Sequence, residues 1–368
     1  KMKFIFLAPR FHTNQNPWVK SMISNGHEVE FNVLFKGKTE NYSILDPIVF
    51  SQCKLSKIIT SLFGDGGVNL VRGFPNPFYY YFYLRDSNAN YIIVRDIGRW
   101  FSFLGALCAR VLGIKIIIYS QTTLHKNYTA SRKLIMDIII KFFRAKWITP
   151  IFGDINKSKN MPSNLYFVPF AVEDTYYQRN TETKKSINIL SIGKFELRKN
   201  HLMLIKVIES LLKVNNNLNL TIIGEVSSNN HWEYFKKCEN FIDENNLSSN
   251  IKILKNIKNN KIKKFYLEND VFILPSTGEP AAITPIEALG FGLPSICSST
   301  NGTRFYIENG VTGIIFKDKS CSSLKNAVKR IIIPKELVRL KKNITSEIKE
   351  SISMNNFYTK FTGILDEE

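Results

Sequence analysis

The amino-acid sequence predicts an α/β protein with two parallel-sheet domains. Short apolar runs of strand length alternate with amphipathic segments of helix length along the 368 residues. A polar stretch over 173–186 interrupts the alternation once, and a chain of this length can bury two cores. We therefore expect an N-terminal domain over 1–172, a linker over 173–186, a C-terminal domain over 187–345, and a helix over 346–368 that packs back toward the N-terminal domain.

The first domain is expected to contain five strands, two helices that each end at a glycine, and a third, basic helix over 131–147. The two helical segments are followed by Gly26 and Gly113, and glycine is the usual residue at a C-terminal cap. These helices are expected over 18–25 and 101–112. The strands are expected over 3–7, 28–34, 91–95, 115–119 and 165–169.

The second domain repeats this alternation. Its helix over 200–213 places Leu202, Ile205 and Ile208 on one face, as burial against a sheet requires. Strands are expected over 187–192, 218–223, 251–254, 271–275 and 294–297, with further helices over 231–244, 261–268 and 284–291. Loops that follow parallel strands open at one edge of the sheet, so we expect the two domains to face each other across a ligand-binding cleft.

The net charge is concentrated in the first half of the chain. Lys and Arg number 50 against 31 Asp and Glu, a net charge of +19, and residues 1–170 hold 22 of the basic and 9 of the acidic residues. The segment 131–147 mixes cations with a broad apolar face, so it could lie on an anionic bilayer. A solvated outer helix face or a general lysine bias explains it equally well. No RNP-like aromatic run, zinc-finger spacing or basic heptad region is present, so we expect no nucleic-acid partner.

Cysteine usage and hydropathy indicate a reducing compartment. The five cysteines are scattered singly, without a Cys-x-x-Cys pair, which excludes a zinc ribbon and a disulfide framework. The most apolar window, 100–119, contains Arg110 and Lys115 and predicts no transmembrane span. We expect a cytoplasmic location, with peripheral attachment to the inner face of the membrane as an open alternative.

The segment 274–299 is the most informative for chemistry. A buried strand ends at Pro275, a loop carries Glu279, and a helix begins near Thr284. Thr284 and Glu287 fit a capping box, with Thr284 as the N-cap. The amides of Ala282 and Ile283 would then lie at an open helix N-terminus, which suits a phosphate. For an isolated pair of glutamates, capping and solvation would be the commoner roles.

The surrounding residues resemble a known signature. The segment is similar to the motif Pro-Ser-x-x-Glu-x-x-Gly-x-x-x-x-Glu-Ala of retaining glycosyltransferases of family 4, the glycosyl transferases group 1, which have the GT-B fold of two Rossmann-like domains. Upstream, Gly193, Lys194 and Lys199 resemble the Gly-Arg-Leu-x-x-x-Lys-Gly motif that follows the first strand of the C-terminal domain. The matching residues of the signature are Pro275, Ser276, Glu279, Glu287, Ala288, Gly292, Pro294, Gly302, Gly310 and Gly313, and Gly224 matches a further glycine.

The resemblance implies roles for these residues. Lys194 and Lys199 would bind the diphosphate of a UDP- or GDP-sugar, Glu287 the ribose hydroxyls, and Glu279 the donor sugar or its leaving oxygen. The rest of the donor site would comprise Gly193, Gly224, Ala282, Ile283 and Thr284. Lysines and helix-terminal amides can neutralise a departing diphosphate without a metal. The sequence has no Asp-x-Asp triplet, P-loop or Gly-x-Gly-x-x-Gly, so we expect neither metal nor cofactor.

Some positions depart from the family pattern. Ala282 replaces the glycine between the two glutamates, and Gln121 stands where many members have a catalytic histidine, with His125 four residues later. The glycine-rich loop after the first strand is replaced by residues that include His12 and Asn14. Gln121 and His125 are candidates for catalysis together with Glu279. His12, Asn14 and Arg95, which ends another first-domain strand, are candidates for the cleft or the acceptor site. We interpret the departures as signs of an unusual donor sugar or acceptor.

Three classes of function follow from this reading. The leading hypothesis is a retaining glycosyltransferase that moves a sugar to a cell-surface glycan or a lipid-linked acceptor. A sugar-nucleotide epimerase on the same fold is the second, and it would need no acceptor. The third is a non-catalytic basic adaptor at a membrane, which would bind no nucleotide.

Overall fold

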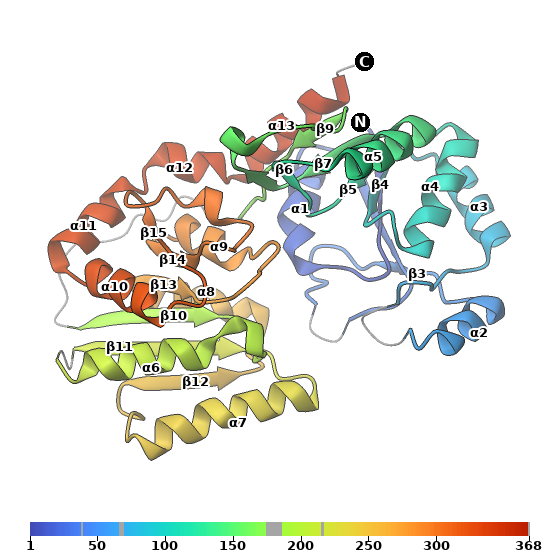
Figure 1. The fold of residues 1–368 in the computed structure, drawn as a ribbon. Helices are drawn as coiled ribbons and strands as arrows, with labels where there is room; N and C mark the ends of the chain where they lie inside the picture. The colour runs from blue at the N-terminus through green and yellow to red at the C-terminus, as the bar shows by residue number, and fades with distance from the viewer. Residues whose placement is uncertain (38–39, 66–69, 174–185, 215–216, 367–368) are drawn as a thin grey trace. The chain divides into compact units, whose positions relative to one another are not determined.

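The computed structural model describes residues 1–37, 40–65, 70–173, 186–214 and 217–366. The chain divides into two compact units (Figure 1): unit 1 comprises Lys1–Ala171 with Met354–Glu368, and unit 2 comprises Val172–Ser353. Most of the expected linker, residues 174–185, lies outside the described residues. Each unit is built on a parallel β-sheet with helices on both faces, so the predicted α/β class is confirmed.

Unit 1 contains a seven-stranded parallel sheet in the order β3-β2-β1-β4-β5-β7-β9. The strands are β1 (Lys3–Leu7), β2 (Glu28–Val33), β3 (Ile48–Val49), β4 (Tyr91–Arg95), β5 (Lys115–Tyr119), β7 (Lys146–Thr149) and β9 (Leu165–Phe167). The central strands are apolar and buried on both faces, which is the pattern that a helix-covered parallel sheet requires. A separate pair, β6 (Thr123–His125) and β8 (Ile151–Gly153), forms a small sheet beside it.

Helices cover the two faces of this sheet. One core cluster packs α3 (Pro77–Asp86), α4 (Trp100–Leu112) and α5 (Ala130–Phe143) against one face. A second cluster packs α1 (Asn16–Ser24) and α13 (Met354–Asp366) against the other face, where the rings of Trp18 and Phe357 stack at 4.9 Å. The remaining helix, α2 (Lys54–Leu62), lies beside residues 72–74, since Ser56 accepts a hydrogen bond from the Phe74 amide.

Unit 2 contains a six-stranded parallel sheet in the order β12-β11-β10-β13-β14-β15. The strands are β10 (Ile187–Ile192), β11 (Leu218–Gly224), β12 (Ile251–Lys255), β13 (Val271–Leu274), β14 (Ser295–Ser298) and β15 (Gly313–Phe316). The helices are α6 (His201–Leu212), α7 (Asn229–Glu244), α8 (Ile262–Glu268), α9 (Thr284–Gly290), α10 (Cys321–Ile331), α11 (Pro334–Asn343) and α12 (Ser346–Ser351). The face of α6 that was predicted to be buried packs in the core with Ile189 and Leu220.

Two expected helices depart from their predicted bounds by more than two residues. The helical part of 131–147 ends at Phe143, because Arg144 adopts a left-handed backbone conformation (φ 48°) and the chain enters β7, where Trp147 is buried. The C-terminal segment 346–368 is two helices rather than one. The backbone of Val172 pairs with residues 352–353 between α12 and α13, and this pairing interrupts the helix.

In the part of the chain that the structure describes, no helix is long and apolar enough to cross a membrane.

Candidate functional site

The motif residues Gly193, Gly224 and Glu279 lie at one edge of the unit 2 sheet. Gly193 follows β10, Gly224 ends β11, and Glu279 lies on the loop that follows β13. These strands are neighbours in the order β11-β10-β13 and run parallel, so their carboxyl ends meet at the same edge. Side chains that are far apart in the sequence, such as Lys199 and Glu279, therefore lie together here.

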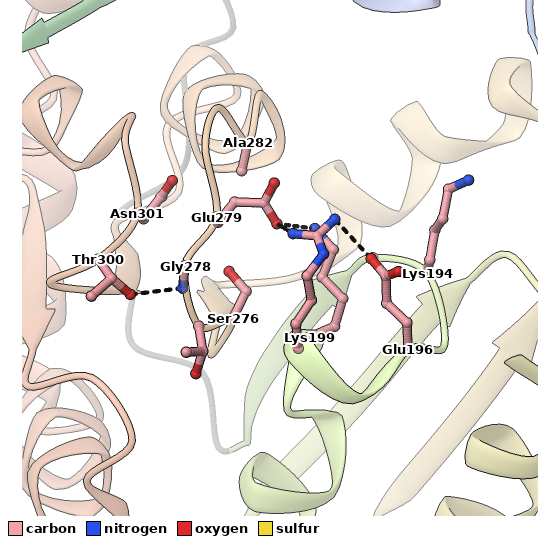
Figure 2. A network of polar contacts seen from close by, with 12 residues as sticks. Lys194, Glu196, Lys199, Ser276, Gly278, Glu279, Ala282, Thr300 and Asn301 are labelled. Carbon is pink, nitrogen blue, oxygen red and sulfur yellow. Dashed lines mark hydrogen bonds and ion pairs between the residues drawn. The ribbon is translucent and has the colours of Figure 1, made fainter. Parts of the chain in front are cut away.

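Two cations converge on the Glu279 carboxylate (Figure 2). Arg198 Nη1 donates to Glu279 Oε2 at 2.5 Å, and the Lys199 ammonium donates to the same oxygen. Arg198 also pairs with Glu196 at 2.7 Å. In Figure 2 the second carboxylate oxygen of Glu279 points away from the two cations. That oxygen can accept a hydrogen bond from a ligand, while Oε2 holds the cations in place.

Burial makes this cluster electrostatically sensitive. Glu279 is 6% exposed and Lys199 is 8% exposed, whereas the Arg198 side chain is 43% exposed. Burial lowers the pKa of the Lys199 ammonium, and the Glu279 carboxylate opposes that shift. Removal of one charge from such a cluster leaves its partners desolvated without a counter-charge, which costs more than breaking a pair on the surface.

Lys194 lies apart from this pair of cations. Its ammonium is 3.0 Å from Glu225 Oε2, and its side chain is partly exposed. The two predicted diphosphate-binding lysines thus flank the loop after β10, and each is held by a different carboxylate.

Two glycines allow the loop after β10 to pass close to its neighbours. A Cβ atom at Gly224 would lie 2.4 Å from the carbonyl oxygen of Gly193 and 2.6 Å from the ring of Phe195. A Cβ atom at Gly193 would lie 3.2 Å from Cδ of Lys199. Close packing therefore explains both glycines: Gly224 lies against the Gly193 backbone and the Phe195 ring, and Gly193 lies against the Lys199 side chain.

His201 supports the same loop through hydrogen bonds to its backbone. Its Nε2 donates to the carbonyl oxygens of Gly193 at 3.0 Å and Lys194 at 3.3 Å, which fixes the neutral tautomer. Burial lowers the pKa of His201 to about 4. The imidazole thus stays neutral at physiological pH and serves as a fixed support for the backbone that carries Lys194.

The loop that carries Glu279 is held on both sides. On one side, Glu279 O accepts from the Gly302 amide at 2.8 Å, and Thr303 Oγ1 donates to Ala282 O at 2.7 Å. On the other side, Asn200 Nδ2 donates to Thr277 Oγ1 at 2.7 Å. This bonding fixes the position of Glu279 before any ligand arrives, which is the condition for electrostatic preorganisation.

The capping box predicted at Thr284 is wrong. In the described residues Ile283 precedes the first turn of α9, Thr284 is its first helical residue, and no side chain caps that end. The Glu287 carboxylate instead accepts a hydrogen bond from Tyr266 Oη at 2.7 Å. Tyr266 is buried and reaches Glu287 from α8, so a tertiary contact replaces the local one. Burial raises the pKa of Glu287, while the Tyr266 hydroxyl opposes that shift.

A second group of polar side chains lies at the carboxyl edge of the unit 1 sheet. Arg95 ends β4, is 8% exposed, and makes two long contacts: Nε lies 3.5 Å from Asp96 Oδ2, and Nη1 donates to Gln15 Oε1 at 3.4 Å. Its guanidinium lies 5.4 Å from the centre of the Tyr119 ring. Burial raises the pKa of the Tyr119 phenol, and Arg95 and Gln121 beside it act in the opposite direction. Arg95 and Gln121 are thus brought together around Tyr119.

The other predicted residues of unit 1 have separate surroundings. His125 lies in β6, where its Nδ1 is 3.2 Å from Ser158 Oγ and its ring packs edge-to-face on Phe152. His12 precedes the short helical turn Thr13–Gln15, and Asn14 lies within it; Gln15 of this turn contacts Arg95. Asn14 therefore adjoins the Arg95 group through its neighbour Gln15, while the contacts of His125 lie within the small β6/β8 region.

Sequence reasoning missed four residues that shape these sites: Arg198, His201, Tyr266 and Gln15. Arg198 lies next to the motif lysine, so a second cation in that turn was an available signal. The role of Tyr266 had no such signal, because α8 carries no recognised motif. Within the described ranges, no group of three or more His, Cys, Asp or Glu side chains could hold a metal ion.

Comparison with known proteins agrees with this geometry. Residues 172–347 match the family model described as Glycosyl transferases group 1. The UDP-Gal:alpha-D-GlcNAc-diphosphoundecaprenol alpha-1,3-galactosyltransferase of Escherichia coli is 24% identical over 289 residues, which are 70% of each chain. Other curated relatives are matched over 13% to 64% of their own length.

Solved structures show the same fold over the whole chain. A glycosyltransferase from Rickettsia africae has a TM-score of 0.73 at 14% identity and covers 100% of both chains. HepE of Anabaena in complex with UDP-glucose has a TM-score of 0.71 at 12% identity, again over 100% of both chains. The chain therefore has the two-domain GT-B fold, and the family model described as Glycosyl transferases group 1 matches its residues 172–347.

Proposed function

We propose that this protein is a retaining glycosyltransferase of family 4 that uses a nucleoside-diphosphate sugar and needs no metal. The observation that carries the proposal is the convergence of Arg198 and Lys199 on Glu279 at the edge of the unit 2 sheet. A sugar nucleotide has an anionic diphosphate beside a neutral, hydroxyl-rich ring. A site for it needs cations and a hydrogen-bond acceptor side by side.

The donor is proposed to bind in unit 2. Lys194 and Lys199 bind the diphosphate, with Arg198 as a third cation on the same turn. The amides of Ala282, Ile283 and Thr284 supply further donors to the phosphates. As the glycosidic bond breaks, these groups stabilise the negative charge that develops on the leaving diphosphate.

Glu279 and Glu287 are proposed to accept hydrogen bonds from donor hydroxyl groups. Glu279 addresses the sugar through the oxygen that points away from Arg198 and Lys199. Glu287 addresses the ribose and is oriented by Tyr266. UDP is the favoured nucleotide, because the name of the Escherichia coli relative specifies UDP-Gal and HepE was solved with UDP-glucose. GDP is the alternative.

The acceptor is proposed to bind in unit 1. Arg95 offers a buried cation with long contacts to its neighbours, and a phosphate or carboxylate of an acceptor would satisfy it. Gln121, Asn14 and His12 lie on loops at or near the same edge, and His125 is kept as a more distant candidate. The name of the Escherichia coli relative specifies a diphosphoundecaprenol-linked acceptor, which supports a lipid-linked or cell-surface glycan acceptor here.

The test is release of nucleoside diphosphate from a panel of UDP- and GDP-sugars, with and without a bacterial lipid and glycan extract. Acceptor-dependent release supports transfer, and NMR of the new linkage reports whether the anomeric configuration is retained. Conversion of the sugar nucleotide without an acceptor would indicate an epimerase instead. No nucleotide binding and no release with any donor would leave a non-catalytic adaptor and would refute the proposal.

A further inference from the structure

Exposed apolar side chains gather on four helices of unit 1. Among the described residues, 25 large hydrophobic side chains are exposed, and 14 of them lie on α2, α3, α4 and α5. Unit 2 has five, each on a different segment. Single exposed apolar residues are normal on a protein surface, whereas a large group of them marks an interaction site.

The exposed residues recur at helical spacing, so each helix presents a continuous stripe. The Leu62 side chain on α2 is 77% exposed and Phe78 on α3 is also 77% exposed. The longer helices repeat the pattern at every fourth residue: Phe103, Leu107 and Val111 on α4, and Leu134, Ile138 and Phe142 on α5. A surface helix normally turns a polar face to water, so these helices are apolar on the side opposite the core as well.

The stripes of α3, α4 and α5 lie on one side of unit 1. The buried faces of α3, α4 and α5 pack in a single cluster against the same face of the sheet, so their outer faces point away from it together. α2 adjoins them, because Ser56 on α2 bonds the Phe74 amide and the Phe74 ring lies 5.8 Å from that of Trp100 at the start of α4. We call the outer surface of these four helices the α2–α5 face.

Cations accompany the apolar stripes. The four helices carry seven basic and two acidic residues, a net charge of +5. Both acids are paired with a cation of their own helix, Asp86 with Arg85 at 2.8 Å and Asp137 with Lys133. Lys57 and Arg132 are exposed on α2 and α5, so the charge is spread across the face.

We propose that the α2–α5 face docks on an anionic lipid bilayer. Apolar side chains that enter the headgroup region, combined with cations that meet anionic headgroups, are the two contributions that bind a peripheral protein to a membrane. A second copy of this chain fits less well, because two identical faces of net charge +5 would repel each other. This inference does not depend on sugar transfer, since it rests on unit 1 alone.

The contacts of these helices decide which residues a membrane test should change. The predicted amphipathic helix over 131–147 ends at Phe143, and Lys133 is engaged with Asp137. The better choices among the cations are Lys57, Arg132 and Lys141, which are exposed. For the apolar stripe we choose Leu134, Ile138 and Phe142, which are 61%, 57% and 55% exposed.

The experiment is sedimentation of the full chain with vesicles of equal parts phosphatidylglycerol and phosphatidylcholine, and with phosphatidylcholine alone. Wild type should bind only the anionic vesicles. The triple variant Lys57→Gln, Arg132→Gln, Lys141→Gln should lower the partition coefficient about 100-fold. The variant Leu134→Gln, Ile138→Gln, Phe142→Gln should lose binding.

Matched controls lie on unit 2. One control variant removes three cations by the substitutions Lys325→Gln, Lys329→Gln and Lys335→Gln. The other removes two exposed apolar side chains by the substitutions Val214→Gln and Ile333→Gln. Both controls should bind like wild type, and all variants should keep the wild-type thermal unfolding and nucleotide affinity.

Three outcomes would overturn the proposal. The first is that wild type does not bind anionic vesicles. The second is that the variants of the α2–α5 face bind as well as the controls. The third is a concentration-dependent dimer in solution that the substitutions of Leu134, Ile138 and Phe142 dissociate. Vesicle binding is measured without donor or acceptor, so its failure is distinct from a failure of sugar transfer.

Discussion

The substitution Glu279→Gln separates the charge of the candidate donor site from its shape. Glutamine keeps the volume and one carbonyl oxygen, but it removes the negative charge that Arg198 and Lys199 share. We expect two effects of opposite sign. Nucleoside diphosphate should bind more tightly, because the cations lose a competing anion, while transfer should slow, because the sugar loses its charged acceptor.

The structure allows both effects to be estimated. A carboxylate and a phosphate about 4 Å apart near a protein surface would repel each other by about 4 kcal/mol. The diphosphate would lie beyond the two cations, and the Arg198 side chain is 43% exposed, so we discount this repulsion to about 1 kcal/mol. That predicts UDP affinity about fivefold higher. Loss of a preorganised electrostatic contact predicts turnover lower by about 100- to 1,000-fold.

The partner substitution Lys199→Met should act differently. It removes a charge-assisted contact to phosphate worth about 1.5–3 kcal/mol, so UDP should bind at least about tenfold more weakly. Isothermal titration of UDP and GDP, beside steady-state turnover, measures both variants. Glu336→Gln is a control, since Glu336 pairs with Arg330 and Arg339 at 2.8 Å on the surface of unit 2. Equal weakening of UDP binding by Glu279→Gln and Lys199→Met would refute the reasoning.

Three further predictions test the supports of the site. The pKa of His201 is lowered to about 4. As the pH falls, His201 is therefore protonated in the unfolded state before it is protonated in the folded state. The contribution of the neutral imidazole to stability is complete above about pH 6.5 and is lost toward pH 4. The difference in unfolding free energy between wild type and His201→Gln, measured by denaturation at several pH values, should therefore fall by about 3 kcal/mol over that window, and a constant difference would contradict the buried neutral imidazole. Tyr266→Phe removes the 2.7 Å hydrogen bond to Glu287 and should raise the KM for donor about five- to tenfold with little change in kcat, whereas an unchanged KM would argue against a ribose contact. Gly224→Ala places a Cβ 2.4 Å from Gly193 O and should lower the stability by about 1–3 kcal/mol and weaken nucleotide binding. Thermal unfolding with and without UDP measures both effects. Unaltered unfolding temperatures would show that the loop can move aside.

The strands were predictable because their residues are buried on both faces. Tyr91–Arg95, Lys115–Tyr119 and Ile187–Ile192 have the predicted bounds, since continuous apolar runs ended by glycine or polar residues can only be central strands here. The end of α5 could not be read from periodicity, because Arg144 takes a left-handed conformation that usually favours glycine or asparagine. The outer face of α5 is also apolar, so hydropathy did not mark where the helix ends.

The sequence predicted residues of the candidate site only where a local motif contains them. Lys199 and Glu279 were found through their motifs, but their direct contact joins positions 80 residues apart and follows from the neighbouring strands β10 and β13. Glu287 was selected as a motif residue, and the capping role predicted for it is wrong because its carboxylate accepts a hydrogen bond from Tyr266 of α8. Contacts of this kind depend on the packing of helices on the sheet, which spacing along one segment does not encode.

The central claim is that the cluster around Glu279 serves sugar transfer from a nucleoside-diphosphate donor. Its most direct test is acceptor-dependent release of UDP or GDP from sugar nucleotides by wild type and Glu279→Gln, assayed side by side at saturating donor. The account predicts release by wild type that the substitution slows by about 100-fold or more. Absence of release by wild type with every donor, or equal rates for the two proteins, would contradict it.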